Sequence, residues 1–185
     1  MAWINVINEE KATGSLKDQY NNLIEPWGGV DNILKIHSLN PESLDAHVRL
    51  YKMAMYGKSI LHRREREMIA VVVSCYNHCY YCLVAHGAAV RYMSDDPMLG
   101  ELLVMNYRAA DLSERHGAML DFTWKLSESP EKIVEADRQA LRDNGFNDQD
   151  IWDISAVASF YNMSNRMALA IDLMPNTDYH SKARG

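Results

Sequence analysis

Short apolar runs separated by helix-start and helix-stop residues make up most of the chain. The pair Asn40-Pro41 is typical of a helix start, because an Asn side chain accepts an early backbone N–H and proline fits the first helical position. Gly57 then marks the end of that helix. The whole pattern predicts a restart of the chain at residues 95–97 and helices over 15–24, 31–37, 41–56, 63–92, 113–126 and 130–145, with a last long helix from 147 or 148 that Pro175 closes.

One apolar run, residues 68–73, is rich in β-branched side chains. Periodicity does not assign a run of this length, but a lone strand would have no partner strand elsewhere in the chain. We therefore predict a buried helix at this run and an all-α fold.

The length of 185 residues and the hydrophobic content of 48% suit a single domain over residues 1–185. A chain of this size buries roughly 70% of its unfolded surface. Shifting residues 61–85 by 85 positions places them on residues 146–170, with six of 25 positions identical. A weak internal repeat, whose second copy has Ser164 and Met167 in place of Cys79 and Cys82, is one interpretation; chance similarity between two apolar helices is the other.

Charge and cysteine content narrow the class of protein. The formal net charge of −6 argues against a dominant interaction with nucleic acid. No apolar stretch approaches the roughly 20 residues of a membrane-spanning helix, and the start of the chain lacks a signal-peptide pattern. The three cysteines are an odd number for a disulfide framework. We therefore expect a cytoplasmic protein with no nucleic-acid or membrane partner.

The strongest chemical signal is the sequence Cys79-x2-Cys82-x3-His86. On a helix these three residues are neighbours on one face. If Asn77 is the N-cap, Cys79 lies in the first turn, where free N–H groups and the positive end of the helix dipole favour a thiolate. His86 can favour a thiolate at Cys82, and a carboxylate such as Glu67, 12 residues before Cys79, can take or relay the proton.

Other interpretations of these residues remain open. The cysteines can be small buried hydrophobes beside a core histidine, or two of them with His86 and a fourth ligand can hold zinc, although typical zinc sites have two ligand pairs. The spacing Cys75-x3-Cys79-x2-Cys82 resembles that of radical S-adenosylmethionine enzymes, which have a larger α/β barrel. Cys75 is most simply a core residue. The charged run at residues 63–67 is expected on a solvated helix face, with Glu67 as the inward exception.

The arrangement Glu67-x11-Cys79-x2-Cys82-x3-His86 resembles the alkylhydroperoxidase-D-like branch of the carboxymuconolactone decarboxylase superfamily, and within it the uncharacterised peroxidase-related proteins. The match is most specific over residues 61–87. The resemblance implies an all-α fold, a homo-oligomer (trimer or hexamer), and reduction of a hydroperoxide to an alcohol and water. It also implies that Cys82 is the peroxidatic cysteine, that Cys79 is the proton donor and the resolving thiol of a Cys79–Cys82 disulfide, and that Glu67 and His86 form the proton relay.

The predicted activity is therefore that of a thiol-dependent peroxidase, an antioxidant enzyme with peroxiredoxin-type activity. Its substrate is an organic hydroperoxide or hydrogen peroxide, its reductant is an unidentified dithiol, and we expect no cofactor and no metal. The best-characterised branch has a histidine immediately before its second cysteine, where this chain has Tyr81. Tyr81 either leaves the relay shorter or donates a hydrogen bond in place of that histidine.

Two alternative functions remain. One is a non-redox enzyme of the same superfamily, such as a decarboxylase that acts on a lactone acid, and the other is a metal-binding or redox-sensing module. The thiol pair favours the peroxidase, because decarboxylation needs acid and base groups but no dithiol.

Overall fold

The computed structural model describes residues 2–26 and 28–184. Within these residues every regular element is a helix, so the predicted all-α fold is confirmed. In chain order the elements are η1 (Glu9–Lys11), α1 (Gly14–Asn21), α2 (Asn32–Lys35), α3 (Pro41–Tyr56), α4 (Arg63–Tyr76), α5 (Tyr80–Ser94), α6 (Pro97–Asn106), η2 (Tyr107–Ala109), α7 (Glu114–Glu128), η3 (Pro130–Lys132), α8 (Glu135–Asp143), α9 (Asp148–Ala170) and η4 (Thr177–His180).

Helix α3 begins and ends where the sequence predicts. The Asn40 side-chain oxygen accepts a hydrogen bond from the N–H of Ser43 at 3.2 Å, and Pro41 is the first helical residue. At Gly57 a Cβ atom would lie 2.5 Å from the carbonyl oxygen of Met53. Only glycine therefore lets the chain leave the helix along this path.

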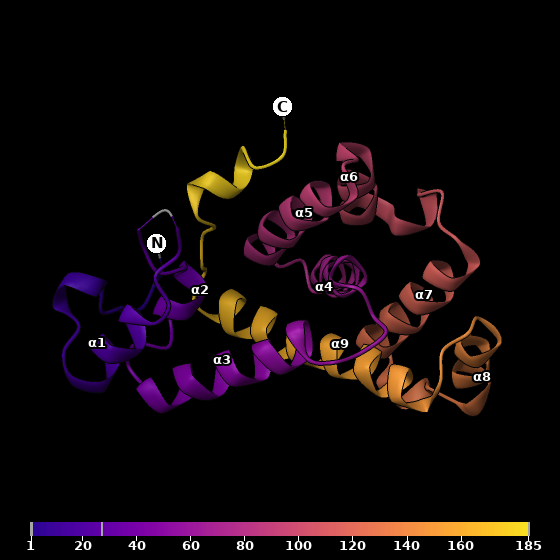
Figure 1. Cartoon of the computed structure of the whole chain (residues 1–185), viewed down its shortest axis with the longest axis horizontal. Helices are drawn as coiled ribbons and strands as arrows, with labels where there is room; N and C mark the ends of the chain where they lie inside the picture. The colour runs from indigo at the N-terminus through magenta and orange to yellow at the C-terminus, as the bar shows by residue number, and fades with distance from the viewer. Residues whose placement is uncertain (1, 27, 185) are drawn as a thin grey trace.

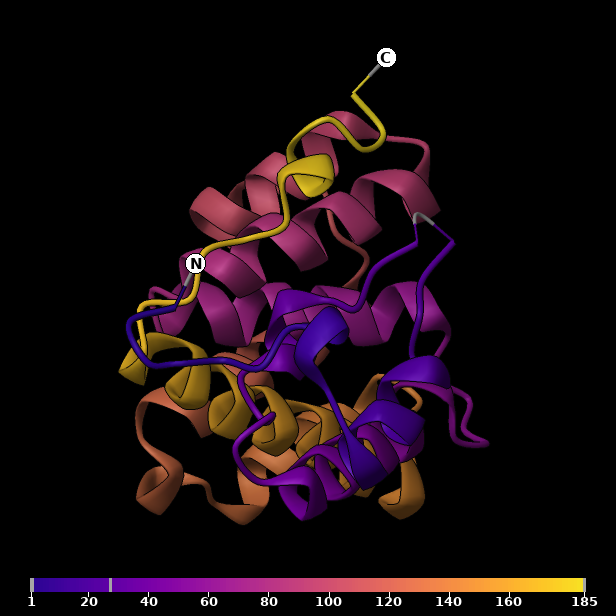
Figure 2. The ribbon, with the colours of Figure 1, turned by 90° about the vertical axis from the view of Figure 1, so that its left-hand side faces the viewer.

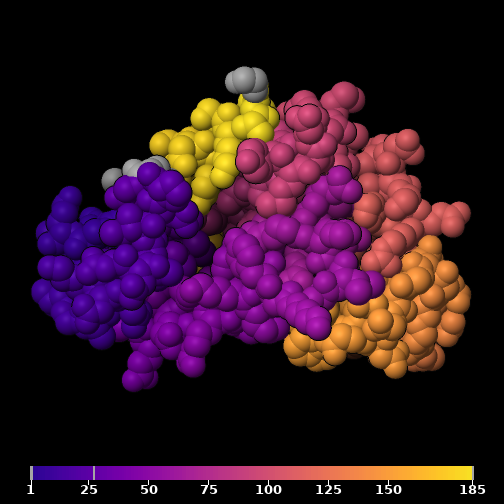
Figure 3. All heavy atoms as spheres, viewed as in Figure 1, coloured from indigo at the N-terminus to yellow at the C-terminus, as the bar shows by residue number. Residues whose placement is uncertain are grey.

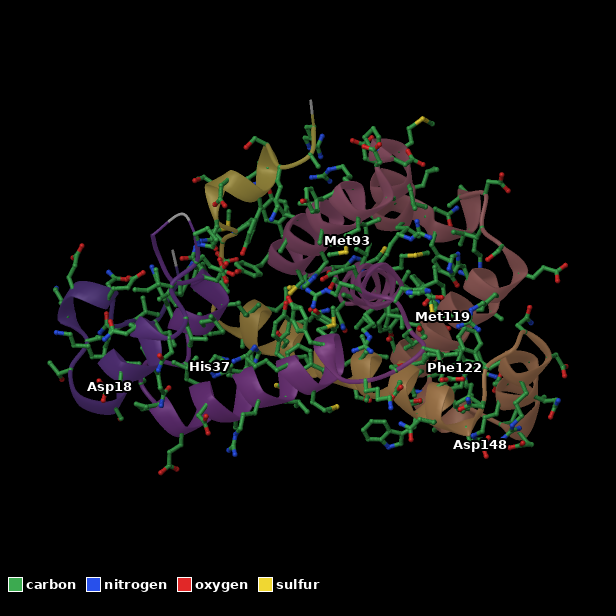
Figure 4. All side chains as sticks on the ribbon, viewed as in Figure 1. Asp18, His37, Met93, Met119, Phe122 and Asp148 are labelled. Carbon is green, nitrogen blue, oxygen red and sulfur yellow. The ribbon has the colours of Figure 1, made fainter. Side chains whose placement is uncertain are left out.

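Helix α4 lies at the centre of the fold. Figure 1 shows it almost end-on, and it packs against α3, α5, α6, α7 and α9. The apolar run 68–73 forms its middle and is fully buried. Met119 and Phe122 of α7, labelled in Figure 4, belong to the core around it. A helix that is enclosed on all sides needs no polar face, which is why periodicity could not assign this run.

The charged run at the start of α4 is not a solvated face, so that expectation is wrong for residues 65 and 66. Glu65, Arg66 and Glu67 are all buried. The Glu65 carboxylate accepts a hydrogen bond from the N–H of His62 at 2.7 Å. Arg66 donates to three backbone carbonyls around the α3–α4 connection, those of Leu61, Ala54 and Gly57. These partners offset the cost of taking the charges out of water.

The prediction of one helix over residues 63–92 is wrong, because this stretch forms two helices, α4 and α5. His78 between them has a φ of +55°. The N–H of His78 bonds to the Cys75 carbonyl at 3.1 Å, and the N–H of Cys79 bonds to the Ser74 carbonyl at 3.0 Å. These two bonds form a Schellman motif, which ends α4. Asn77 is therefore the C-cap of α4, and Cys79 is the N-cap of α5.

Two later boundaries also differ from the prediction. The helix expected over 130–145 is a short 3-10 turn, η3, followed by α8, which begins where the Asp137 carboxylate accepts a hydrogen bond from the N–H of Val134 at 2.8 Å. The last long helix, α9, ends at Ala170 instead of just before Pro175. The restart at residues 95–97 is confirmed, because the Asp96 carboxylate caps α6.

The segments that the 85-residue shift pairs are in contact. Asn77 and Asn162, which the shift pairs, are hydrogen-bonded at 2.9 Å. The internal repeat and the single domain stay predictions.

Residues 171–184, which we call the C-terminal tail, run back along the molecule. The N–H of Trp3 bonds to the carbonyl of Ile171 at 2.9 Å, and Figure 2 shows the two ends of the chain passing each other. In Figure 3 the tail (yellow) lies between the N-terminal segment (indigo) and the α5–α6 region. In the described part of the chain, no helix combines the length and apolar character needed to cross a bilayer.

Candidate functional site

A buried carboxylate and a histidine form the centre of the site. Glu67 on α4 is only 1% exposed, and its Oε2 lies 2.6 Å from Nδ1 of His86 on α5. Its Oε1 accepts two hydrogen bonds from Arg63, one turn earlier on α4, at 2.6 and 3.0 Å. The packing of α5 on α4 thus brings together two residues that are 19 positions apart in the sequence.

The charges around Glu67 fix its protonation. Burial raises the pKa of the carboxyl, but His86 and Arg63 outweigh it, and the pKa falls below the ordinary value. An ionised Glu67 favours a proton on Nδ1 of His86. Nε2 is then the ring nitrogen that can accept or return a proton in the space that His86 lines.

The two thiols lie at the start of α5. Cys79 is its N-cap and Cys82 is in its first turn, and both are buried and free. They pack in a small apolar cluster with Ile36 beside α2, Ala168 near the end of α9 and Leu173 of the C-terminal tail. Cys82 and His86 lie on α5, and Cys79 is the N-cap of the same helix. The three residues therefore belong to one helix, as the spacing predicts, although Cys79 does not lie inside it.

The thiols form one titrating pair. A hydrogen bond between them is the largest cause of both shifts, and it lowers the pKa of Cys79 while it raises the pKa of Cys82. Burial raises both pKa values, and the backbone N–H groups of Cys82 and Tyr81 lower that of Cys79. The pair therefore loses its first proton more easily than its second. Cys79 lies at the N-terminal end of α5, and the positive end of the helix dipole favours a thiolate there.

A cavity of about 910 Å³ gives access to this chemistry. Cys82, His86 and Glu67 line it, and of the two thiols, both in the described part of the chain, only Cys82 does so. Its other walls come from the N-terminal segment, α3, α5, α9 and the C-terminal tail. They combine apolar side chains with charged ones near the N-terminal segment, α3 and the tail: Leu23, Ile24, Ile33, Leu34, Val48, Ala85, Ala89 and Phe160 are apolar, and Glu25, Asp31, Lys52, Asp178 and Lys182 are charged.

Among the polar residues of this cavity, sequence reasoning missed Arg63, Tyr51, Tyr56 and Tyr161. Arg63 pairs with Glu67, donates to the Tyr51 hydroxyl at 3.0 Å and stacks 4.1 Å from the Tyr56 ring centre. The Tyr161 ring packs edge-on against His86 with 4.5 Å between centroids, and its buried hydroxyl has no partner among the described residues. Only Arg63 has a sequence signal, because it lies four residues before Glu67.

Tyr81 occupies the position of the histidine in the best-characterised branch. Its ring lines the cavity, but its hydroxyl accepts a hydrogen bond from the N–H of Ile33 at 3.3 Å and donates to Asn176 of the tail at 3.4 Å. Burial raises the pKa of Tyr81, so the hydroxyl stays protonated at neutral pH. These bonds hold α2 and the tail to α5, and neither of them is to Glu67 or His86.

We expect Tyr81→Phe to lower the free energy of unfolding by about 1 kcal/mol, the usual contribution of a hydrogen bond, and to leave hydroperoxide turnover within about twofold. Urea unfolding and a turnover assay test this. Tyr80→Phe is the matched control, because its side chain is 51% exposed. A tenfold loss of turnover in Tyr81→Phe alone would instead place the hydroxyl in the proton relay.

The remaining candidates lie apart from this chemistry. Cys75, expected in the core, is half-buried, and its thiol donates to the Val104 carbonyl at 3.1 Å. Within residues 2–26 and 28–184, no group of three or more His, Cys, Asp or Glu side chains is arranged to hold a metal ion.

The model of the carboxymuconolactone decarboxylase family matches residues 41–97. An uncharacterised peroxidase-related protein from Silicibacter sp. TM1040 is 49% identical, with a TM-score of 0.87 over 98% of this chain and 93% of that one. The alkylhydroperoxidase AhpD core of a peroxidase-related protein from Ralstonia eutropha JMP134 is 33% identical, with a TM-score of 0.93 over 100% and 97%.

A more distant structure shares the fold. The debrominase Bmp8 in complex with 2,3,4-tribromopyrrole is 16% identical, with a TM-score of 0.79 over 98% of this chain and 97% of that one. No match is found among curated proteins.

Proposed function

Because this chain belongs to the carboxymuconolactone decarboxylase family, among its alkylhydroperoxidase-D-like, peroxidase-related members, we propose that it is a thiol-dependent peroxidase. The observation that carries the proposal is the buried Glu67–His86 pair in a cavity that Cys82 also lines. An acid–base pair and a dithiol are the groups that peroxide reduction requires.

In the first step Cys82 is the nucleophile. His86 Nε2, with Glu67 on its other nitrogen, takes the Cys82 proton, and the thiolate attacks the terminal oxygen of the hydroperoxide. The O–O bond breaks, Cys82 becomes a sulfenic acid, and the departing alkoxide takes the proton back from His86 and leaves as the alcohol. This assigns to His86 the proton delivery that the family resemblance implies for Cys79, because the lowered pKa of Cys79 favours its thiolate, which has no proton to donate.

In the second step Cys79 resolves the intermediate. Its thiolate attacks the Cys82 sulfenic sulfur, hydroxide leaves with a proton as water, and a Cys79–Cys82 disulfide forms. A dithiol reductant then returns both thiols. One hydroperoxide and two thiols thus give one alcohol, one water and one disulfide.

The cavity supports organic hydroperoxides over hydrogen peroxide as substrates. A volume of about 910 Å³ is within the range of sites for organic ligands, and its apolar side chains favour an alkyl or aryl group. Each buried CH₂ group contributes about 0.8 kcal/mol to binding. Hydrogen peroxide has no such group.

Steady-state turnover tests the function. With dithiothreitol as reductant, we expect cumene hydroperoxide to be converted to the alcohol with a kcat/KM at least about tenfold above that for hydrogen peroxide. Cys75→Ser is the control and should retain this activity, because its thiol lies apart on α4. No turnover of either peroxide above the enzyme-free rate would contradict the proposal.

We also propose a homo-oligomer. Trp152, Met163 and Met167 lie along one side of α9 and are 56%, 39% and 41% exposed. Large apolar side chains grouped in this way favour contact with another protein surface.

A further inference from the structure

A second cavity, of about 370 Å³, lies between α5, α6 and the C-terminal tail. The tail separates it from the thiol cavity, because Tyr179 and Lys182 line the thiol cavity while His180 and Arg184 line the second one. In Figure 1 the tail passes beside α5, which is consistent with this arrangement. The second cavity contains none of the groups assigned to the peroxidase chemistry.

A buried arginine forms the inner wall of the second cavity. Arg91 of α5 is 5% exposed, and its Nε is buried without a partner among the described residues. Within residues 2–26 and 28–184 its one side-chain hydrogen bond is from Nη2 to the carbonyl of Lys182, at 3.3 Å. A guanidinium has five N–H donors, and burying it with so few partners costs stability unless an anion meets it.

The helices are shaped around this side chain. A Cβ atom on Gly100 of α6 would lie 2.5 Å from Cγ of Arg91 and 3.0 Å from the carbonyl of Gly87 on α5. A Cβ atom on Gly87 would lie 3.3 Å from Cγ2 of Val104 on α6. Glycine at these two positions therefore lets the helices cross closely and places the guanidinium at the cavity.

The charges at the second cavity do not cancel. Arg184 also lines it and pairs with Glu101 at 3.3 Å, but both of these side chains are more than half exposed. Among the described residues, two guanidinium groups thus face one carboxylate, which leaves one positive charge. The remaining lining includes four apolar side chains, those of Leu83, Val84, Val104 and Met105, together with Tyr80, Gly100 and His180.

We propose that this cavity is a binding site for a monoanionic carboxylate with an apolar chain. Arg91 and Arg184 hold the carboxylate, because a guanidinium fork matches its two oxygens. The chain of the ligand lies against Val84 and Val104. The ligand fixes the tail that forms one wall of the thiol cavity.

Titration calorimetry at low ionic strength tests the proposal, with octanoate, its neutral analogue octanol, and inorganic phosphate as probes. We expect the wild type to bind one octanoate per chain, and to bind octanol and phosphate at least tenfold more weakly than octanoate. Arg91→Gln should bind octanoate at least tenfold more weakly than the wild type does. Glu101→Gln should bind octanoate more tightly, because it removes the competing carboxylate. Arg108→Gln, which removes a guanidinium paired elsewhere with Asp121, should leave binding unchanged.

Several outcomes would overturn the site. Equal binding of octanoate by wild type and Arg91→Gln would place the ligand elsewhere, for example in the thiol cavity. Equal binding of octanol would show an apolar pocket without anion recognition, and tighter binding of phosphate would show a different ligand class. If Arg91→Gln does not fold, the exposed position of Glu101 keeps the test decisive: unchanged or weaker octanoate binding by Glu101→Gln contradicts the proposal.

Discussion

Replacing Cys82 by serine is expected to lower kcat/KM for cumene hydroperoxide at least about a thousandfold, because an alcohol at neutral pH supplies no nucleophile comparable to a thiolate. The fold should be retained, since serine is close to cysteine in size. Steady-state turnover and far-ultraviolet circular dichroism measure the two effects. Cys75→Ser is the matched control, because it makes the same chemical change at a thiol outside the cavity.

Cys79→Ser should give a different result from Cys82→Ser. It leaves the first step intact and removes the resolving thiol, so one equivalent of hydroperoxide should be consumed and a sulfenic acid should accumulate on Cys82. Trapping with dimedone and peptide mass spectrometry locate it. The reverse pattern, with the sulfenic acid on Cys79 in Cys82→Ser, would make Cys79 the attacking thiol, as its lowered pKa allows.

Replacing Glu67 by glutamine should damage both stability and activity. The change leaves the half-buried Arg63 without its anionic partner, and breaking a buried ion pair in this way typically costs about 3–5 kcal/mol. It also removes the charge that stabilises a protonated His86, so kcat/KM should fall by about a hundredfold or more. Urea unfolding and steady-state turnover test the two effects.

The contribution of Glu67 to the free energy of unfolding should depend on pH. Its pKa in the folded protein lies below the ordinary value of 4.5, so its contribution is present above that value and is lost as the pH falls through the folded pKa. The Glu67→Gln variant should therefore show a flatter loss of stability below about pH 4.5 than the wild type.

Asp45→Asn is the control for the Glu67 predictions. Its partner is Arg49, one helical turn away, and both side chains are more than half exposed. A surface pair of this kind contributes at most about 1 kcal/mol. If Glu67→Gln behaves like Asp45→Asn in unfolding and turnover, the buried pair has neither the structural nor the chemical role given to it here.

Local sequence signals predicted the elements whose boundaries depend on single residues. Asn40, Pro41 and Gly57 delimit α3 because their capping and termination act within one helical turn. The interruption between α4 and α5 was raised only through Asn77 as an N-cap, and its position was wrong, because His78 adopts a left-handed conformation without being glycine. Burial of Glu65 and Arg66 was also missed, since their partners come from other segments of the chain.

The candidate site was predictable only in part for the same reason. The spacing of Cys79, Cys82 and His86 pointed to the site, with Glu67 as a proposed proton acceptor, and the family resemblance gave these residues their roles. The structure brings Glu67 and His86 into contact. The wall of the cavity comes from the N-terminal segment, α3, α9 and the tail, which no local pattern places together. The unpartnered hydroxyl of Tyr161 is likewise a consequence of tertiary packing.

Reduction of a hydroperoxide by Cys82 and Cys79, with oxidation of their own thiols, can be measured directly in a single turnover without reductant. Fully reduced protein is mixed with one equivalent of cumene hydroperoxide, and thiol state, alcohol and bound metal are measured on the same sample. We predict one equivalent of alcohol and a Cys79–Cys82 disulfide, with Cys75 still free to alkylate. Unchanged thiols at both positions, or hydroperoxide loss without that disulfide, would contradict this mechanism.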